Sequence, residues 1–162
     1  MSDFSEKRVH QQIRNFERVM DEYEGKEPFA RFLTSFFKLN KQMGSKDRKS
    51  TSRLCYNYFR LGGAAKHLSQ QKRLVVAEYL CETDSPLVSL FEPTWNQELL
   101  LQNKLIFLKE QGILGDSPIF PFEKYLSEEI DQLDFQTNQF IQPNLFIRIK
   151  KGKEKFVSAI FE

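Results

Sequence analysis

The sequence predicts an all-α fold built as a bundle of amphipathic helices, and three observations support this prediction. Apolar residues recur at intervals of three and four along most of the chain. Glycine, proline or a capping residue stands near most of the expected helix ends. The 162 residues are 40% hydrophobic and include 16 phenylalanines, which is enough for one domain with a substantial core.

The first two helices are expected at residues 5–24 and from Pro28 onward. In the first, apolar side chains recur every three or four residues until Gly25, which favours a helix end. In the second, proline suits the first turn, because its missing N–H has no partner there in any case. Its phenylalanines make the second helix the most apolar of the set, so we expect it to lie at the centre.

The third helix is expected from Ser45, as its N-cap, to the Gly62-Gly63 pair. One of its faces is apolar enough to pack. Because successive residues turn by about 100°, its cations gather on the opposite side, and they are Lys46, Lys49, Arg53 and Arg60, with Tyr56 and Asn57 along the same stripe. No acid stands four residues from any of them, although helices made only for solubility usually carry such pairs. A solvated helix face is the alternative interpretation of this stripe. Arg48 points nearer the apolar side, so an intramolecular salt bridge is expected for it.

Further helices are expected along the rest of the chain. Ser69 is the predicted cap of the fourth helix, and Trp95 the predicted anchor of the bundle. The helices are predicted at residues 70–82, 86–91, 97–111, 127–133 and 134–141, the last two begun by Ser127 and Asp134.

The C-terminal residues have a different pattern. In residues 145–150 the β-branched Ile147 and Ile149 alternate with other side chains, which indicates a strand. Residues 154–161 are expected to form a last helical piece. A single strand cannot form a sheet. We therefore predict a helical domain over residues 1–141, and at residues 142–162 the start of a second, α+β subdomain that is incomplete.

Charge is distributed unevenly along the chain. Residues 38–73 hold ten Lys/Arg and one acid, whereas residues 74–144 hold three Lys/Arg and twelve acids. The basic block is typical of a face that binds a polyanion, and the acidic block is a candidate surface for a protein partner. No apolar run approaches the roughly 20 residues that span a bilayer, so no membrane contact is predicted.

The sequence offers no catalytic or metal-binding pattern. The seven glycines form neither a dinucleotide-binding nor a phosphate-binding loop. Cys55 and Cys81 belong to no CxxC or Cys/His cluster, so we assign no metal ligand. The two histidines suggest no nucleophile–base pair, and we assign no catalytic residue. Free thiols in core-like positions favour a reducing compartment, and we expect a cytoplasmic protein.

Two stretches resemble a known family. Gly44-Ser45-Lys46-Asp47-Arg48, followed by a helix that ends Tyr56-Asn57-Tyr58-Phe59-Arg60, resembles the NusB-like N-terminal domain of the Sun/NOP, small-subunit ribosomal RNA methyltransferase B-like, cytosine-C5 RNA methyltransferases. The segment 142–149, Gln-Pro-Asn-Leu-Phe-Ile-Arg-Ile, resembles the start of their next RNA-binding subdomain. The family commonly has an aromatic continuation after the helix, where this chain has Leu61-Gly62-Gly63.

The resemblance implies a NusB-like helical bundle that docks a methyltransferase on ribosomal RNA. It also implies that the whole protein uses S-adenosylmethionine and a cysteine nucleophile, neither of which is expected within these residues, so the chain is expected to stop before the catalytic domain. Neither cysteine follows a proline, so neither is expected to take the catalytic role.

We therefore expect an RNA-binding module for small-subunit ribosomal RNA, without a cofactor of its own. The expected contacts to RNA phosphates come from cations of the basic block, and Tyr56 is expected to stack on an unpaired base. The predicted RNA-binding residues are Lys41, Lys46, Lys49, Arg53, Tyr56 and Arg60. The alternative is a NusB-like protein-interaction or antitermination adaptor that has no enzymatic partner domain.

Overall fold

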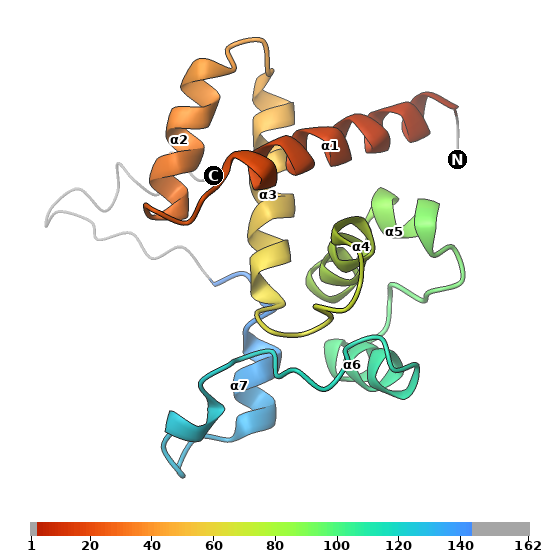
Figure 1. Cartoon of the computed structure of the whole chain (residues 1–162). Helices are drawn as coiled ribbons and strands as arrows, with labels where there is room; N and C mark the ends of the chain where they lie inside the picture. The colour runs from red at the N-terminus through yellow and green to blue at the C-terminus, as the bar shows by residue number, and fades with distance from the viewer. Residues whose placement is uncertain (1–2, 144–162) are drawn as a thin grey trace, which may run out of the picture.

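Helix α3 (Ser45–Arg60) runs through the middle of the molecule, and α1 (Asp3–Glu22) crosses it (Figure 1). The structure is a computed structural model that describes residues 3–143. Helix α4 (Gln70–Cys81) also packs against α3, and α5 (Pro86–Phe91) packs against α1 and α4. The remaining elements are α2 (Phe29–Leu39), α6 (Leu101–Glu110), the short 3₁₀ helix η1 (Glu123–Tyr125) and α7 (Gln132–Asn138).

The regular elements within residues 3–143 are all helices, so the all-α class is confirmed for that part. The strand predicted at residues 145–150 and the helical piece at 154–161 lie outside the described residues. The division into 1–141 and 142–162 stays a prediction. No helix among the described residues is both long and apolar enough to cross a membrane.

The centre of the core is α4, and the prediction that the second helix is central was wrong. Every residue from Leu74 to Leu80 is buried, whereas in α2 only Leu33 and Phe36 are buried and Leu39 is 84% exposed. Helix α4 is apolar on nearly all sides, which suits a fully surrounded helix. Phe29 and Phe32 of α2 instead pack against Tyr23, which directly follows α1, and Phe29 also packs against Phe59 of α3.

The ends of α3 differ partly from the prediction. Ser45 is already helical, so Gly44 takes the N-cap position and no side chain caps this end. Asp47 lies in the first turn, where a carboxylate complements the helix dipole. At the other end Gly62 adopts a left-handed φ of +52°, as a helix stop requires.

Two of the predicted helix starts were confirmed. The hydroxyl of Ser69 accepts the amide N–H of Lys72 at the start of α4, and Pro86 stands in the first turn of α5. Trp95 is buried against Tyr79 and Phe107, as expected of an anchor.

Helix α6 begins at Leu101 instead of residue 97, because the residues before it make other hydrogen bonds. The side chain of Asn96 accepts the N–H of Glu98, and Gln97 bonds to the backbone N–H of Ser85 and to the Ser89 hydroxyl. Such side-chain bonds to nearby backbone compete with helix formation.

The two helices predicted at 127–133 and 134–141 are one helix, α7. Its cap is Asp131, whose carboxylate accepts the N–H of Asp134, and Asp134 itself lies in the first turn. Ser127 starts only a turn, because its carbonyl accepts the N–H of Ile130. The error follows from having several capping residues within one short stretch, where pattern alone cannot choose between them.

Candidate nucleic-acid interface

The outer side of α3 borders a shallow cleft of about 470 Å³. Four of the six residues predicted to bind RNA line it, together with residues of α4 and of the segment after α7. The lining residues are Lys49, Ser50, Arg53, Tyr56, Asn57, Arg60, Cys81, Glu82 and Gln142. Lys41 and Lys46 are exposed but do not line this cleft. The cleft therefore combines cations and a tyrosine ring on one wall with a carboxylate on the other.

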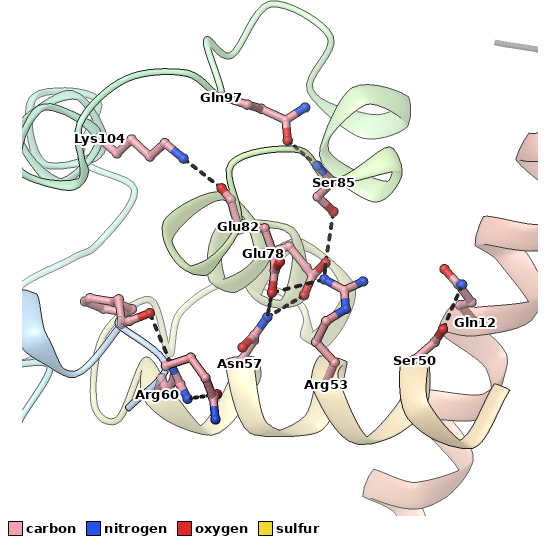
Figure 2. Close-up of polar contacts among 12 residues, drawn as sticks. Gln12, Ser50, Arg53, Asn57, Arg60, Glu78, Glu82, Ser85, Gln97 and Lys104 are labelled. Carbon is pink, nitrogen blue, oxygen red and sulfur yellow. Dashed lines mark hydrogen bonds and ion pairs between the residues drawn. The ribbon is translucent and has the colours of Figure 1, made fainter. Parts of the chain in front are cut away.

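The guanidinium of Arg53, on this wall, forms ion pairs within the protein. Its guanidinium lies 2.6 Å from Glu78 Oε2 and 3.2 Å from Glu82 Oε1 (Figure 2). Glu78 is fully buried, and its carboxylate also accepts hydrogen bonds from Asn57 Nδ2 at 2.8 Å and Ser85 Oγ at 2.9 Å. The acids that neutralise Arg53 thus come from the neighbouring helix and not from α3 itself.

The electrostatics of this pair follow from its burial. Burial alone lowers the pKa of Arg53, but the carboxylates of Glu78 and Glu82 raise it by more, so Arg53 remains charged. Burial raises the pKa of Glu78 above its ordinary value, although Arg53, Asn57 and Ser85 all favour the ionised form. Burial thus favours the protonated form of the Glu78 carboxyl, whereas Arg53, Asn57 and Ser85 favour the ionised form.

The polar contacts continue into α5 and α6. The amide oxygen of Gln97 accepts the backbone N–H of Ser85, and Lys104 donates to the carbonyl oxygens of Tyr79 and Glu82 at 2.9 and 2.8 Å. Lys104 is buried, and that burial lowers its pKa. As Figure 2 shows, these side chains converge on α4 from several neighbouring elements, so the inner wall of the cleft is held by a shared set of hydrogen bonds.

Arg60 is likewise engaged within the protein. Its guanidinium donates to the carbonyl oxygen of Phe140 at 3.1 Å and to Gln142 Oε1 at 2.5 Å (Figure 2). These bonds hold the segment after α7 against the last turn of α3, and they bring Gln142 to the rim of the cleft.

The three lysines predicted to bind RNA differ from Arg48, Arg53 and Arg60, which are bonded within the protein. Lys41, Lys46 and Lys49 are exposed and form no ion pair with any residue between 3 and 143. Arg48 donates to the carbonyl oxygens of Met43 and Lys41 and lies over the Phe37 ring, so its role is intramolecular, as expected, but the expected salt bridge is not what it forms.

Tyr56 keeps an accessible ring. It is 43% exposed, and its inner edge packs against Phe29 at a ring-centroid distance of 5.5 Å. One side of the ring is thus supported by α2 while part of it faces solvent beside Lys49 and Arg60. An aromatic ring held in this way can stack on a nucleobase without first losing much conformational freedom.

The thiol of Cys81, which lines the cleft, is unreactive at neutral pH. Burial raises the pKa of the Cys81 thiol to about 12, and burial does the same for Cys55. Both are therefore protonated at neutral pH, and the thiolate is the reactive form. Among the described residues, no group of three or more His, Cys, Asp or Glu side chains could hold a metal ion.

The sequence interpretation missed Glu78, Glu82 and Asn57 as parts of this site. One signal was present: Glu78 interrupts an otherwise apolar run, Leu-Val-Val-Ala-Glu-Tyr-Leu, at residues 74–80. A carboxylate in a helix that is buried all round needs a cation or several donors, so such a glutamate predicts a partner from another element. The partner's identity, however, depends on the packing of α3 on α4.

Comparison with known proteins gives no relative from which a role could be transferred. No protein-family model, no curated protein and no solved structure matches this chain.

Proposed function

We propose that this protein is an RNA-binding module that holds RNA along the outer side of α3. The observation that carries the proposal is the cleft in which the half-exposed Tyr56 ring lies beside Lys49 and Arg60. Unpaired bases stack on aromatic rings, and nearby cations contact the phosphates on either side. Lys41 and Lys46 extend the cationic surface beyond the cleft.

In this proposal Arg53 has a structural role instead of the phosphate contact that was predicted from the sequence. Because its guanidinium is bound by Glu78 and Glu82, it contributes little net charge to the RNA, and it instead fixes the wall from which Tyr56 projects. The phosphate contacts then come mainly from the three exposed lysines, and Arg60 supplies any donor that its bonds to Phe140 and Gln142 leave free.

The direct test is the affinity for a single-stranded RNA oligonucleotide, measured by fluorescence anisotropy at several salt concentrations. Removing phosphate contacts lowers both the affinity and the steepness of its salt dependence, by a slope of about 0.7 per contact for single strands. We expect Lys46→Glu/Lys49→Glu to weaken binding at least about tenfold at low salt and to flatten the slope. Tyr56→Ala should weaken binding by a similar factor with the slope unchanged, because stacking involves no counterion.

The matched control is Lys26→Glu/Lys124→Glu, which makes the same change in net charge at two exposed lysines away from α3. If this control weakens RNA binding as much as the α3 variant, the effect comes from overall charge and the α3 surface is only a solvated face. Arg53→Glu is not a suitable variant, because it would place three carboxylates together and disturb the fold.

The resemblance to the Sun/NOP enzymes extends the proposal. On that basis the module belongs to an S-adenosylmethionine-dependent ribosomal RNA cytosine-5 methyltransferase, its fold is of the NusB type, and its ligand is small-subunit ribosomal RNA in the cytoplasm. Cys55 and Cys81 are free thiols, as is usual in a reducing compartment. The gene sequence after Glu162 tests this extension: a glycine-rich cofactor loop and a Pro-Cys motif support it, and a stop codon directly after Glu162 contradicts it.

A second candidate function is a protein-interaction adaptor, and a specific observation favours it. Within residues 100–141, six large apolar side chains are more than half exposed: Leu100, Ile106, Phe122, Tyr125, Leu133 and Ile141. Ile106 and Leu133 line one shallow pocket, and contiguous exposed apolar groups are typical of protein-binding surfaces. A pull-down that recovers a protein but no RNA, and that is lost in Leu133→Ser but not in the more exposed control Leu39→Ser, would favour this function.

A further inference from the structure

A second cleft, of about 670 Å³, lies between the turn that follows α3 and the loop that follows α6. Neither the proposed RNA surface nor the polar contacts around Glu78 include it. Its lining residues are Lys66, His67, Lys109, Gly112, Leu114, Gly115, Asp116 and Ser117. Basic side chains from two distant parts of the chain therefore face one opening.

The two segments are held together by their backbones. The N–H of Gly63 donates to the carbonyl oxygen of Ile119 at 3.1 Å, and the N–H of Ala65 donates to that of Leu114 at 2.7 Å. A Cβ at Gly62 would lie 1.8 Å from the Ile119 oxygen, and one at Gly63 would lie 2.3 Å from the Pro118 oxygen. A side chain at either glycine would prevent this contact. The Gly62-Gly63 pair therefore fixes the position of Lys66 and His67 relative to the loop.

The backbone next to these basic residues is strained. Ala65, directly before Lys66, has a φ of +56° although it is not a glycine, and it is fully buried. Such conformations persist only where the surroundings enforce them, and they gather at functional sites. On the facing loop, Gly115 has a φ of +69°, and a Cβ there would lie 2.9 Å from His67 Nδ1. Ala65 is thus held in a conformation that non-glycine residues rarely adopt, and the close approach of His67 requires glycine at position 115.

The groups in the cleft are free to bind a ligand. The side chains of Lys66, His67, Lys109 and Asp116 form no ion pair or hydrogen bond with the residues of the described part of the chain. The backbone N–H groups of Gly115, Asp116 and Ser117 likewise donate no hydrogen bond to a described residue. Successive amides without a hydrogen bond, in a glycine-containing loop that lines the same cleft as two lysines and a histidine, suit a tetrahedral oxyanion. Asp116 is the opposing charge and weakens that attraction.

We propose that this cleft binds a phosphate-type oxyanion, with Lys66 and Lys109 as the charged contacts and the loop 115–117 as the source of amide donors. The ligand is a phosphodiester of RNA or a free phosphate, which share this chemistry. The proposal does not depend on the RNA role of the cleft along α3.

The first test is a titration of the full chain with inorganic phosphate, followed by the NMR amide signals of residues 115–117, with chloride at equal ionic strength as the reference. We expect saturable shifts of these signals in the wild type. Lys66→Ala/Lys109→Ala should weaken binding by about tenfold for each lost charged contact, whereas Asp116→Asn should tighten it severalfold. Lys26→Ala, an exposed lysine elsewhere, should leave it unchanged.

The unchanged binding expected for Lys26→Ala separates a local contact from a general effect of charge, and the opposite directions of the other two variants exclude a general loss of folding. It is overturned if phosphate produces no saturable shift at residues 115–117, or if Lys66→Ala/Lys109→Ala binds phosphate as well as the wild type. All variants change exposed side chains, and an unchanged amide spectrum outside the cleft checks that each has folded.

A second arm identifies the source of the phosphate group, with a single-stranded RNA oligonucleotide as the probe. If Lys66→Ala/Lys109→Ala weakens RNA binding as well, the ligand is a phosphodiester of RNA. If RNA affinity is unchanged while phosphate binding is lost, the ligand is a free phosphate. A protein that binds phosphate here but no RNA at all would refute the proposed RNA function and leave this inference standing.

Discussion

In the first half of α3, Lys46 and Lys49 are exposed and form no ion pair with any described residue, whereas in the second half Arg53 and Arg60 reach back into the protein. Both halves belong to the same basic stripe. The planar guanidinium can bind two acceptors at once, so arginine suits a cross-link between elements, and the strongly hydrated ammonium of lysine suits a surface. A stripe that looks uniform in the sequence is therefore divided into an exposed part and a structural part.

The largest loss of stability is expected for Arg53→Ala, which tests whether the second half of α3 is structural. It leaves the fully buried Glu78 without its cation, and removal of one partner of a buried pair costs about 3 kcal/mol. We take the lower end of the usual range because the Arg53 side chain is 35% exposed and water can replace part of the interaction. Urea unfolding measures the difference.

Lys49→Ala is the control for that prediction, since it removes a charge one turn earlier on the same stripe. Its effect on the free energy of unfolding should stay within about 0.5 kcal/mol. Equal losses in the two variants would show that the halves of α3 are not divided in the way described.

The next effect concerns Arg60, whose two bonds join α3 to the segment after α7. Arg60→Met keeps the apolar stem but loses both donors, and each bond to a charged group contributes about 1.5 kcal/mol or more. We expect a loss of about 2 kcal/mol at most, because one acceptor is exposed, together with faster hydrogen exchange of the amides near Phe140. Unchanged exchange there would mean that other contacts hold this segment.

The fold was predictable where a single residue fixes a helix end, and less so where several residues compete. Ser69 and Pro86 determine their helix starts through local bonds or backbone angles. Asn96 and Gln97 delay α6 through bonds that depend on α5 being near, which no local pattern contains. The candidate site shows the same limit: Tyr56 and Lys49 follow from helical spacing, but the pairing of Arg53 with Glu78 depends on how α3 and α4 pack.

The buried carboxylate gives a third, smaller effect, which is visible through pH. The pKa of Glu78 is raised in the folded state, so this group stabilises the protein most fully below its unfolded pKa, and that contribution is lost as the pH rises through its folded pKa. Glu78→Gln has no such titration. The stability of the wild type relative to Glu78→Gln should therefore decrease as the pH increases from 4 to 7.

Urea unfolding of both proteins at matched ionic strength checks that direction. An increase in the relative stability of the wild type over this range would show that Arg53, Asn57 and Ser85 outweigh the burial of the carboxylate.

The smallest change in stability is expected at a buried polar group of α3 that has no hydrogen-bond partner among the described residues. The side chain of Thr51, on the packed face of α3, is fully buried, and its hydroxyl has no hydrogen-bond partner in the structure. A buried hydroxyl without a partner loses its bonds to water and gains none, so Thr51→Val should raise the free energy of unfolding by about 1 kcal/mol.

Thr137 in α7 is the matched control for this gain, because it is also buried but its hydroxyl donates to the carbonyl oxygen of Leu133 at 2.8 Å. Thr137→Val removes a satisfied donor and should be neutral or destabilising by up to about 1 kcal/mol. A gain in both variants would reflect only the greater hydrophobicity of valine. A gain in Thr51→Val alone would show that the absent partner is what limits stability there, in contrast to Asn57, whose amide NH₂ donates to both Glu78 and Glu82.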